Sequence, residues 1–122
     1  MYNLLSAQSV VSEIVRDEKG DIFSIKYYGT GPKKHELLKL ETFHWNGHVS
    51  RLESFSSGLK NGVYKEFFNN GKIKIDGQYS NGDKTGLWTE YFREGGTMRV
   101  FYTNENRKDG SISEWYKNGG KK

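Results

Sequence analysis

One ten-residue pattern occurs three times in the second half of the chain, at an interval of 24 residues both times. The copies begin at Gly62, Gly86 and Gly110 and read GVYKEFFNNG, GLWTEYFREG and GSISEWYKNG. The opening glycine, the glutamate, the two aromatic residues after it and the closing glycine are in register in all three. A repeat of this length is typical of stacked supersecondary units, because one unit cannot bury its apolar face alone. The pattern therefore predicts a repeat architecture.

The composition agrees with a thin sheet. Only 34% of the 122 residues are hydrophobic, which by itself favours disorder. However, 15% are aromatic and one residue is proline, whereas disordered chains are poor in aromatics. A chain of this length has room for one core. We therefore expect a single domain over residues 1–122, with an N-terminal hairpin or cap at 1–37 and the repeats at 38–120.

Turn residues divide the chain into short β-strands. Asn46-Gly47 is a strong hairpin signal, since both residues tolerate the positive φ of a type I′ turn, and Gly47 lies 24 residues before Gly71. We therefore expect an all-β fold, a single elongated antiparallel meander of hairpin repeats with about nine strands. The expected strands are Val10–Arg16, Asp21–Tyr28, His35–Trp45, His48–Phe55, Val63–Phe68, Lys72–Tyr79, Leu87–Arg93, Thr97–Thr103 and Ser111–Lys117.

The first twenty residues allow two interpretations. Apolar residues between positions 4 and 15 have roughly helical spacing, which favours a short amphipathic helix. The alternative is a hairpin whose loop ends at Gly20. We favour the hairpin, because this glycine supplies the positive φ that a three- or four-residue loop requires.

Side-chain alternation along the strands places large aromatics on both faces of the sheet. One face is expected to carry Tyr64, Glu66, Phe68, Trp88, Glu90, Phe92, Ile112, Glu114 and Tyr116. The other is expected to carry Val63, Phe67, Leu87, Tyr91 and Trp115. No helical segment is available to cover either face, so the aromatics should pack laterally from strand to strand.

The repeats resemble the MORN-repeat variant, a family of bacterial repeat proteins with antitoxin-like members. The resemblance rests on Gly-x-Trp-x-Glu-Tyr-Phe, a glycine turn and a return that reads x-Gly-x-Tyr-x-Asn-Gly-x-x-x-Gly. The matching positions are Gly77, Tyr79, Asn81, Gly82, Gly86, Trp88, Glu90, Tyr91, Phe92 and Gly95. The match covers residues 58–120 well and 38–57 weakly. Tyr64, Ile112 and Asn106 depart from the pattern. The resemblance implies a scaffold or binding surface and no catalytic residue.

Two groups of residues could in principle support catalysis or bind a metal. Glu66, Glu90 and Glu114 form a column with roughly 9–10 Å between members, a separation that would suit paired hydrolase acids. A residue repeated in every unit is better explained as part of the unit, and a two-residue turn at Glu94-Gly95 would set Glu90 opposite Arg99. His44 and His48 flank a turn, with His35 and Glu41 nearby, yet surface histidines explain this better than a metal. We expect no enzyme activity, cofactor or metal.

Basic residues interleave with the aromatics, and the net charge is +4. We expect a cytoplasmic, non-enzymatic module that binds and inhibits or modulates another protein, such as a toxin or a bacterial defence nuclease. An antitoxin, an immunity protein or an anti-CRISPR protein would belong to this class. The expected partner-binding residues are exposed aromatics with two cations at their margin: Tyr64, Phe67, Lys74, Trp88, Tyr91, Arg99, Trp115 and Tyr116.

Three alternatives remain open. Cations beside aromatics also suit single-stranded nucleic acid such as RNA. Some MORN-type proteins contact acidic lipids, although we do not expect a membrane partner here. The open strand edge at Ser111–Lys117 allows an edge-paired dimer in place of a monomer, against which Lys117, Lys121 and Lys122 argue mildly.

Overall fold

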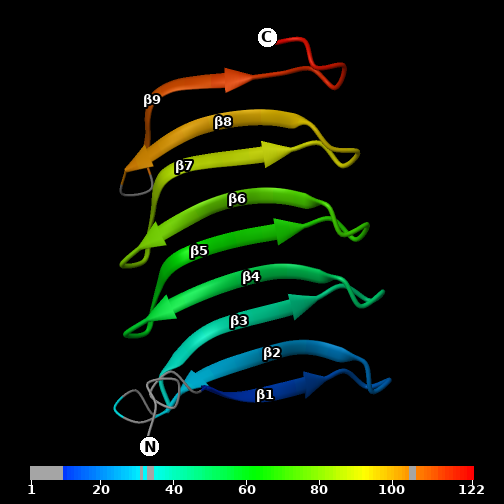
Figure 1. Cartoon of the computed structure of the whole chain (residues 1–122), viewed down its shortest axis with the longest axis vertical. Helices are drawn as coiled ribbons and strands as arrows, with labels where there is room; N and C mark the ends of the chain where they lie inside the picture. The colour runs from blue at the N-terminus through cyan, green and yellow to red at the C-terminus, as the bar shows by residue number, and fades with distance from the viewer. Residues whose placement is uncertain (1–9, 31, 33–34, 105–106) are drawn as a thin grey trace, which may run out of the picture.

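The computed structural model describes residues 10–30, 32, 35–104 and 107–122. These residues form one open nine-stranded antiparallel sheet in which every strand pairs with its neighbours in sequence (Figure 1). The expected all-β meander is therefore confirmed. The strands are β1 (Val10–Arg16), β2 (Ile22–Gly29), β3 (Leu37–Phe43), β4 (Val49–Ser56), β5 (Leu59–Phe67), β6 (Ile73–Ser80), β7 (Asp83–Tyr91), β8 (Thr97–Asn104) and β9 (Arg107–Glu114).

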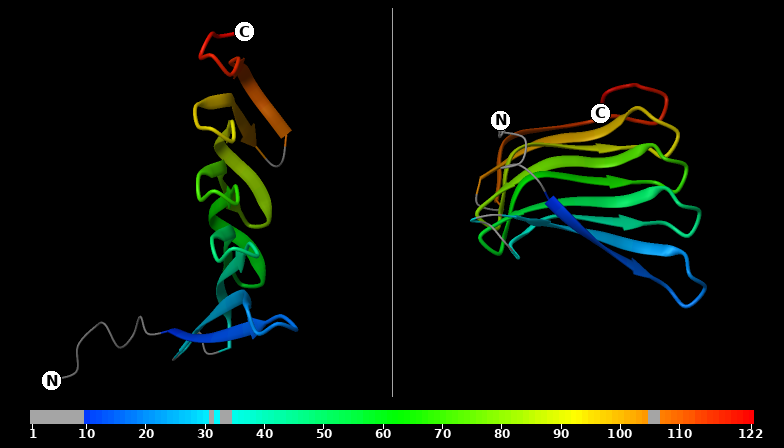
Figure 2. Two further views of the ribbon diagram at one scale, coloured as in Figure 1. Left: turned by 90° about the vertical axis from the view of Figure 1, so that its right-hand side faces the viewer. Right: turned by 60° about the horizontal axis from the view of Figure 1, so that its bottom comes forward.

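The sheet is elongated and twisted, with β1 and β9 at its two ends (Figure 2). A right-handed strand twist accumulates along an open sheet in this way. The strand at Val10–Arg16 favours the hairpin over the helix for these residues, while the rest of the proposed helix, residues 1–9, lies outside the described part. Among the described residues, no helix is long and apolar enough to cross a membrane.

The loops that follow the odd-numbered strands are copies of one turn. In each, the N–H of the first residue donates to the carbonyl of the fifth. The carbonyl of the first residue accepts from the N–H of the fourth, a glycine with φ between 87° and 109°. This is a type I turn followed by a glycine in the left-handed region. The glycines are Gly20, Gly47, Gly71, Gly95 and Gly119. The structural repeat therefore begins before residue 38.

This turn corrects two expectations. Asn46-Gly47 does not form a type I′ turn, because among its two residues only Gly47 has positive φ. The connection at Glu94-Gly95 is likewise the longer turn, with Phe92 donating to Gly96. Glu90 nevertheless pairs with Arg99, as expected. Type I′ turns occur instead after the even-numbered strands β4 and β6, at Ser57-Gly58 and Asn81-Gly82, where both residues have positive φ.

The opening glycine of the repeat lies inside a strand, at a bulge. Around Gly62 the pairing passes from Glu53–Tyr64 to Phe55–Lys60, so three residues of β5 face one residue of β4. The same irregularity surrounds Gly86 in β7. The expected strand starts at Val63 and Leu87 are therefore four residues too late. The last strand also ends at Glu114 and not at Lys117, because Tyr116–Gly120 forms the fifth turn.

The buried cluster is small and lies on one face of β5 to β8. It consists of Tyr64, Trp88 and Phe101, with Ile75 and Tyr79 packed against it. The Trp88 ring is 5.6 Å from that of Tyr64 and 5.5 Å from that of Tyr79. Trp88 lies directly over Gly77 of β6, where a Cβ atom would be 2.2 Å from the indole. Lateral aromatic packing thus replaces a second layer.

Lysine side chains cover the outer surface of this cluster. The Lys60 ammonium lies 5.0 Å from the Tyr79 ring centre and 3.3 Å from a carboxylate oxygen of buried Glu53. The Lys84 ammonium lies 4.8 Å from the Trp88 ring centre. The alkyl parts of lysines shield apolar surface while their charged ends remain in water. This cover explains how a chain of low hydrophobicity holds a buried core.

The protonation of Tyr64 makes the stability of this core depend on pH. Burial, followed by the hydrogen bond that its hydroxyl donates to Glu66 at 2.6 Å, raises its pKa above the ordinary 10.0. The folded state therefore keeps the proton when the unfolded chain loses it, and stability falls as pH rises above about 10. We expect the free energy of unfolding, measured by urea titration from pH 8 to 11, to fall less steeply in Tyr64→Phe. An equal slope in both proteins would contradict this assignment.

Candidate binding face

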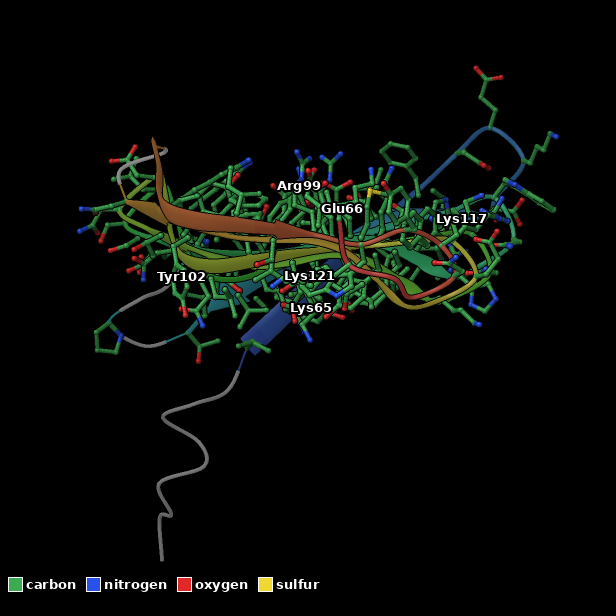
Figure 3. All side chains as sticks on the ribbon, turned by 90° about the horizontal axis from the view of Figure 1, so that it is seen from above. Lys65, Glu66, Arg99, Tyr102, Lys117 and Lys121 are labelled. Atoms are coloured by element: carbon green, nitrogen blue, oxygen red, sulfur yellow. The ribbon has the colours of Figure 1, made fainter. Side chains whose placement is uncertain are left out.

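The two faces of the sheet differ in how far they are covered. We call the side that carries Tyr64, Trp88 and Phe101 the core face and the opposite side the reverse face. In Figure 3, Glu66 and Arg99 point to the core face, whereas Lys65, Tyr102 and Lys121 point to the other side. In the described part of the chain, no helix or second sheet packs on the reverse face.

An aromatic stripe runs across the reverse face. It consists of Phe43, Phe67, Tyr91 and Trp115, which follow one another at 24-residue intervals. The first three end strands β3, β5 and β7, each at the pairing irregularity before the five-residue turn. All four are half-buried. Because equivalent strands are two strand spacings apart, consecutive members are separated by roughly 9–10 Å.

An apolar row lies beside this stripe, nearer the type I′ turns. We define it as Val63, Leu87 and Tyr102, whose exposed fractions are 42%, 47% and 55%. Leu87 and Tyr102 are direct cross-strand partners, and Val63 pairs with exposed Gln78 on the intervening strand. The row and the stripe are four residues apart along β5 and β7, with Lys65 and Thr89 between them on the same face. Exposed apolar residues gathered on one face and accompanied by polar residues are typical of interaction sites.

The reverse face carries cations beside its apolar residues. Lys65 belongs to it by alternation, and Lys121 lies with its ammonium 5.9 Å from the Trp115 ring centre. Lys65 forms no ion pair with any described residue, although its cross-strand neighbour is Asp76. The arrangement is suited to a partner that offers acidic groups beside apolar ones.

Some expected binding residues are not on this surface. Phe67, Tyr91 and Trp115 lie on the reverse face, but Tyr64 and Trp88 have only 8% and 2% of their surface exposed. The expectation that these two aromatics are exposed is wrong, because they form the core. Arg99 is also on the core face, where it donates to Glu90 at 2.6 Å and lies 5.6 Å from the Phe101 ring centre. Lys74 is the extra residue at the pairing irregularity between β5 and β6, and its ammonium lies 5.7 Å from the Phe68 ring centre.

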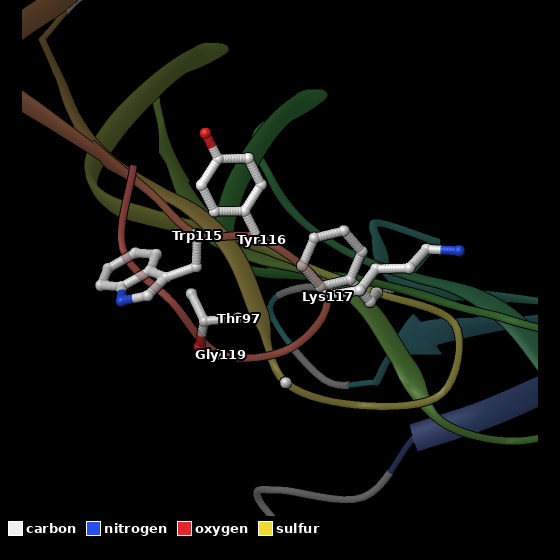
Figure 4. A pocket seen from close by; sticks show the side chains of 7 residues that line it. Thr97, Trp115, Tyr116, Lys117 and Gly119 are labelled. Atoms are coloured by element: carbon white, nitrogen blue, oxygen red, sulfur yellow. The ribbon is translucent and has the colours of Figure 1, made fainter.

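Tyr116 is exposed and lies at the last five-residue turn. It lines a hollow of about 310 Å³ between the turns of β7–β8 and of the chain end (Figure 4). The hollow is also lined by Phe92, Thr97, Trp115 and Lys117. Since Trp115 belongs to the aromatic stripe, this hollow adjoins the reverse face at the turns that follow β7 and β9.

The candidate chemical groups have structural contacts. Glu66 pairs with Ile75, Ile75 with Glu90, Glu90 with Arg99, and Arg99 with Glu114, so the glutamates form the expected single row. His44 Nε2 is 2.8 Å from the carbonyl oxygen of Phe67 in the next unit, and the His48 ring lies against Gly71. Among the described residues, no three histidine or acidic side chains come together as a metal site.

Sequence reasoning missed several members of the reverse face. Phe43 could have been found, because it lies 24 residues before Phe67. Tyr102 carries no such signal, since the residue 24 positions earlier, Gln78 of β6, is not aromatic. Its place in the apolar row follows only from its pairing with Leu87.

Comparison with known proteins adds no identification. No protein-family model matches the chain, and no curated protein matches it. The likeness to the MORN-repeat variant is a resemblance of residues.

Proposed function

We propose that this protein is a non-enzymatic interaction module that binds another protein through the reverse face and inhibits or modulates it. The observation that carries the proposal is that the aromatic stripe and the exposed apolar row lie on the same face of the sheet. Aromatic residues in a desolvated centre commonly supply most of the binding energy of an interface. Three residues of the aromatic stripe lie on paired strands and Trp115 forms a bridge with Lys121, so little conformational entropy is lost when they bind.

The charge pattern favours a protein partner that offers acidic groups beside apolar ones. Lys65 lies between the apolar row and the aromatic stripe, Lys121 lies beside Trp115, and both can steer an acidic partner toward this face. Nucleic acid is the second candidate, since cations and aromatics share this face. The acidic residues Glu41 and Asp76 on the same face favour protein over a phosphate backbone, because carboxylates repel phosphates. A toxin or defence nuclease is the partner class that we propose.

Leu87→Asp is expected to abolish binding to the partner and leave the fold intact. The substitution places a carboxylate in the centre of the apolar row, where it loses water on binding and has no cation opposite. We expect affinity to fall at least tenfold. The measurement is retention of the partner from nuclease-treated host lysate on immobilised protein, followed by titration of the purified partner.

Ile112→Asp provides the matched control, because Ile112 has 48% of its surface exposed against 47% for Leu87. By alternation along β9, Ile112 lies on the core face, so this variant should bind normally. Equal loss in both variants, or retention that depends on nucleic acid and falls steeply with salt, would contradict the proposal.

A further inference from the structure

The two edges of the sheet are protected to different degrees. The outer strand β9 carries charged residues at Arg107, Lys108, Asp109 and Glu114. The end of the chain also folds back along it, with a bridge between Trp115 and Lys121 and a hydrogen bond of 2.8 Å from the Lys122 amide to the Glu114 carbonyl. Charged residues and covering segments are the usual protection of a sheet edge against pairing with another chain.

The other edge strand, β1, lacks this protection. It reads VVSEIVR, and Val10, Val11 and Ile14 have 48%, 55% and 48% of their surface exposed. Arg16, one of its two charged residues, is turned back to the carbonyl of Gly20 at 2.9 Å. Within the described residues, nothing pairs with the outer side of β1. An exposed apolar edge strand is a site for pairing with another strand.

We propose that β1 pairs antiparallel with β1 of a second copy of this chain, in the register that sets Ser12 of one copy opposite Ser12 of the other. Residues opposite each other must point to the same face, so a residue of β1 lies opposite its own copy. Only the registers with Ser12, Glu13 or Ile14 in that position pair five or more residues of Val10–Arg16. The Glu13 register sets like charges directly opposite each other, which is destabilising. The Ile14 register leaves Val10 and Val11 outside the paired segment.

The Ser12 register satisfies the requirements that the other two fail. Val10 of each copy lies opposite Ile14 of the other, and Val11 lies opposite Glu13. All three exposed apolar residues of the strand are therefore within the paired segment, and no like charges face each other. Because β1 is the unprotected edge and β9 the protected one, pairing of this isologous kind closes at two copies and does not propagate into a fibre.

The dimer has a consequence that rests on the proposed function. A two-fold axis perpendicular to the sheet keeps both reverse faces on the same side. The dimer would then present two equivalent binding surfaces and gain avidity for a partner that is itself dimeric. The pairing of β1 does not depend on this consequence and is tested without any partner.

The absence of cysteine from the sequence allows a direct test of the register. Ser12→Cys is expected to form a cross-linked dimer on mild oxidation of the full-length protein, because directly opposed Cα atoms lie about 4.5–5.5 Å apart, within disulfide range. Glu13→Cys is the control, since its two copies are offset by two residues, about 6.8 Å along the strand. More cross-linking through Glu13→Cys than through Ser12→Cys would overturn the proposed register.

The edge itself is tested by light scattering. The wild-type chain is expected to have twice its monomer mass of 14.1 kDa at about 100 μM, whereas Ile14→Lys should raise the dissociation constant at least tenfold. Ile112→Lys in β9 is the control, with the same exposed fraction of 48%, and should remain dimeric. A monomeric wild type, or loss of the dimer through Ile112→Lys alone, would overturn the proposal. Circular dichroism checks that each variant is folded, and cross-linking of Ser12→Cys tests the dimer without a charge change.

Discussion

Replacing Gly77 by alanine is expected to destabilise the protein by about 3 kcal/mol or more, at the upper end of the range for overpacked cores. The added Cβ would lie 2.2 Å from the Trp88 indole, a distance that no relaxed structure allows. Neither group can yield cheaply, because Gly77 is paired with Tyr64 in the strand ladder and Trp88 is fixed between Tyr64 and Tyr79. Alanine is otherwise preferred to glycine inside a strand by roughly 0.5–1 kcal/mol, so the predicted effect opposes the intrinsic preference.

The measurement is urea denaturation followed by circular dichroism, with Gly120→Ala as the control. Neither of these two glycines has positive φ, but the nearest atom to a Cβ at position 120 is the flexible Asn118 side-chain oxygen at 3.2 Å. In a Trp88→Leu background, which leaves room beside residue 77, the cost of Gly77→Ala should decrease by at least about 1 kcal/mol. An additive double mutant would contradict the steric explanation.

Trp88→Ala is expected to cost about 3–5 kcal/mol, the range for truncating a buried large aromatic residue. Trp88 is 2% exposed and is the largest fully buried side chain among the described residues. Its removal leaves a cavity between Tyr64, Tyr79 and Phe101, and its indole donor to the carbonyl of Thr85 is also lost. Since small domains have a total stability of roughly 5–15 kcal/mol, this variant should be mostly unfolded or close to unfolding.

Trp45→Ala is the natural comparison. Trp45 is 83% exposed in a five-residue turn, and truncation of an exposed residue changes stability by about 0.5 kcal/mol or less. Chemical denaturation of both variants, followed by circular dichroism at the same pH, separates burial from tryptophan content. Similar losses in the two variants would show that Trp88 is not the centre of the core.

The repeat in the sequence was sufficient to predict the topology. The 24-residue interval, the turn glycines and the lack of a helical segment predict a meander, and the structure confirms it. The glutamate row was also predicted correctly, because side-chain alternation and a constant interval together determine which residues share a row. The pairing of Glu90 with Arg99 was predicted from a two-residue turn that does not form, and it holds because a register shift between Glu90 and Tyr91 compensates for the longer turn.

Strand boundaries were harder to predict, for a local reason. Sequence reasoning placed Gly62 and Gly86 between strands, because glycine is typical of turns. Both do have the positive φ of turn glycines. The pairing of β4 with β5 and of β6 with β7 continues on both sides of them, which makes them bulges. Backbone conformation at one residue does not distinguish a turn from a bulge, since the difference lies in what the neighbouring strand does.

The period, the order of the strands and the alternation of side chains between the two faces follow from the sequence. Which of the two aromatic faces is buried follows only from how the strands pack. That choice depends on Gly77, whose missing side chain leaves the space that Trp88 fills once β6 and β7 are in register. The reverse face has no such space, so its aromatic stripe and its apolar row remain partly exposed to solvent.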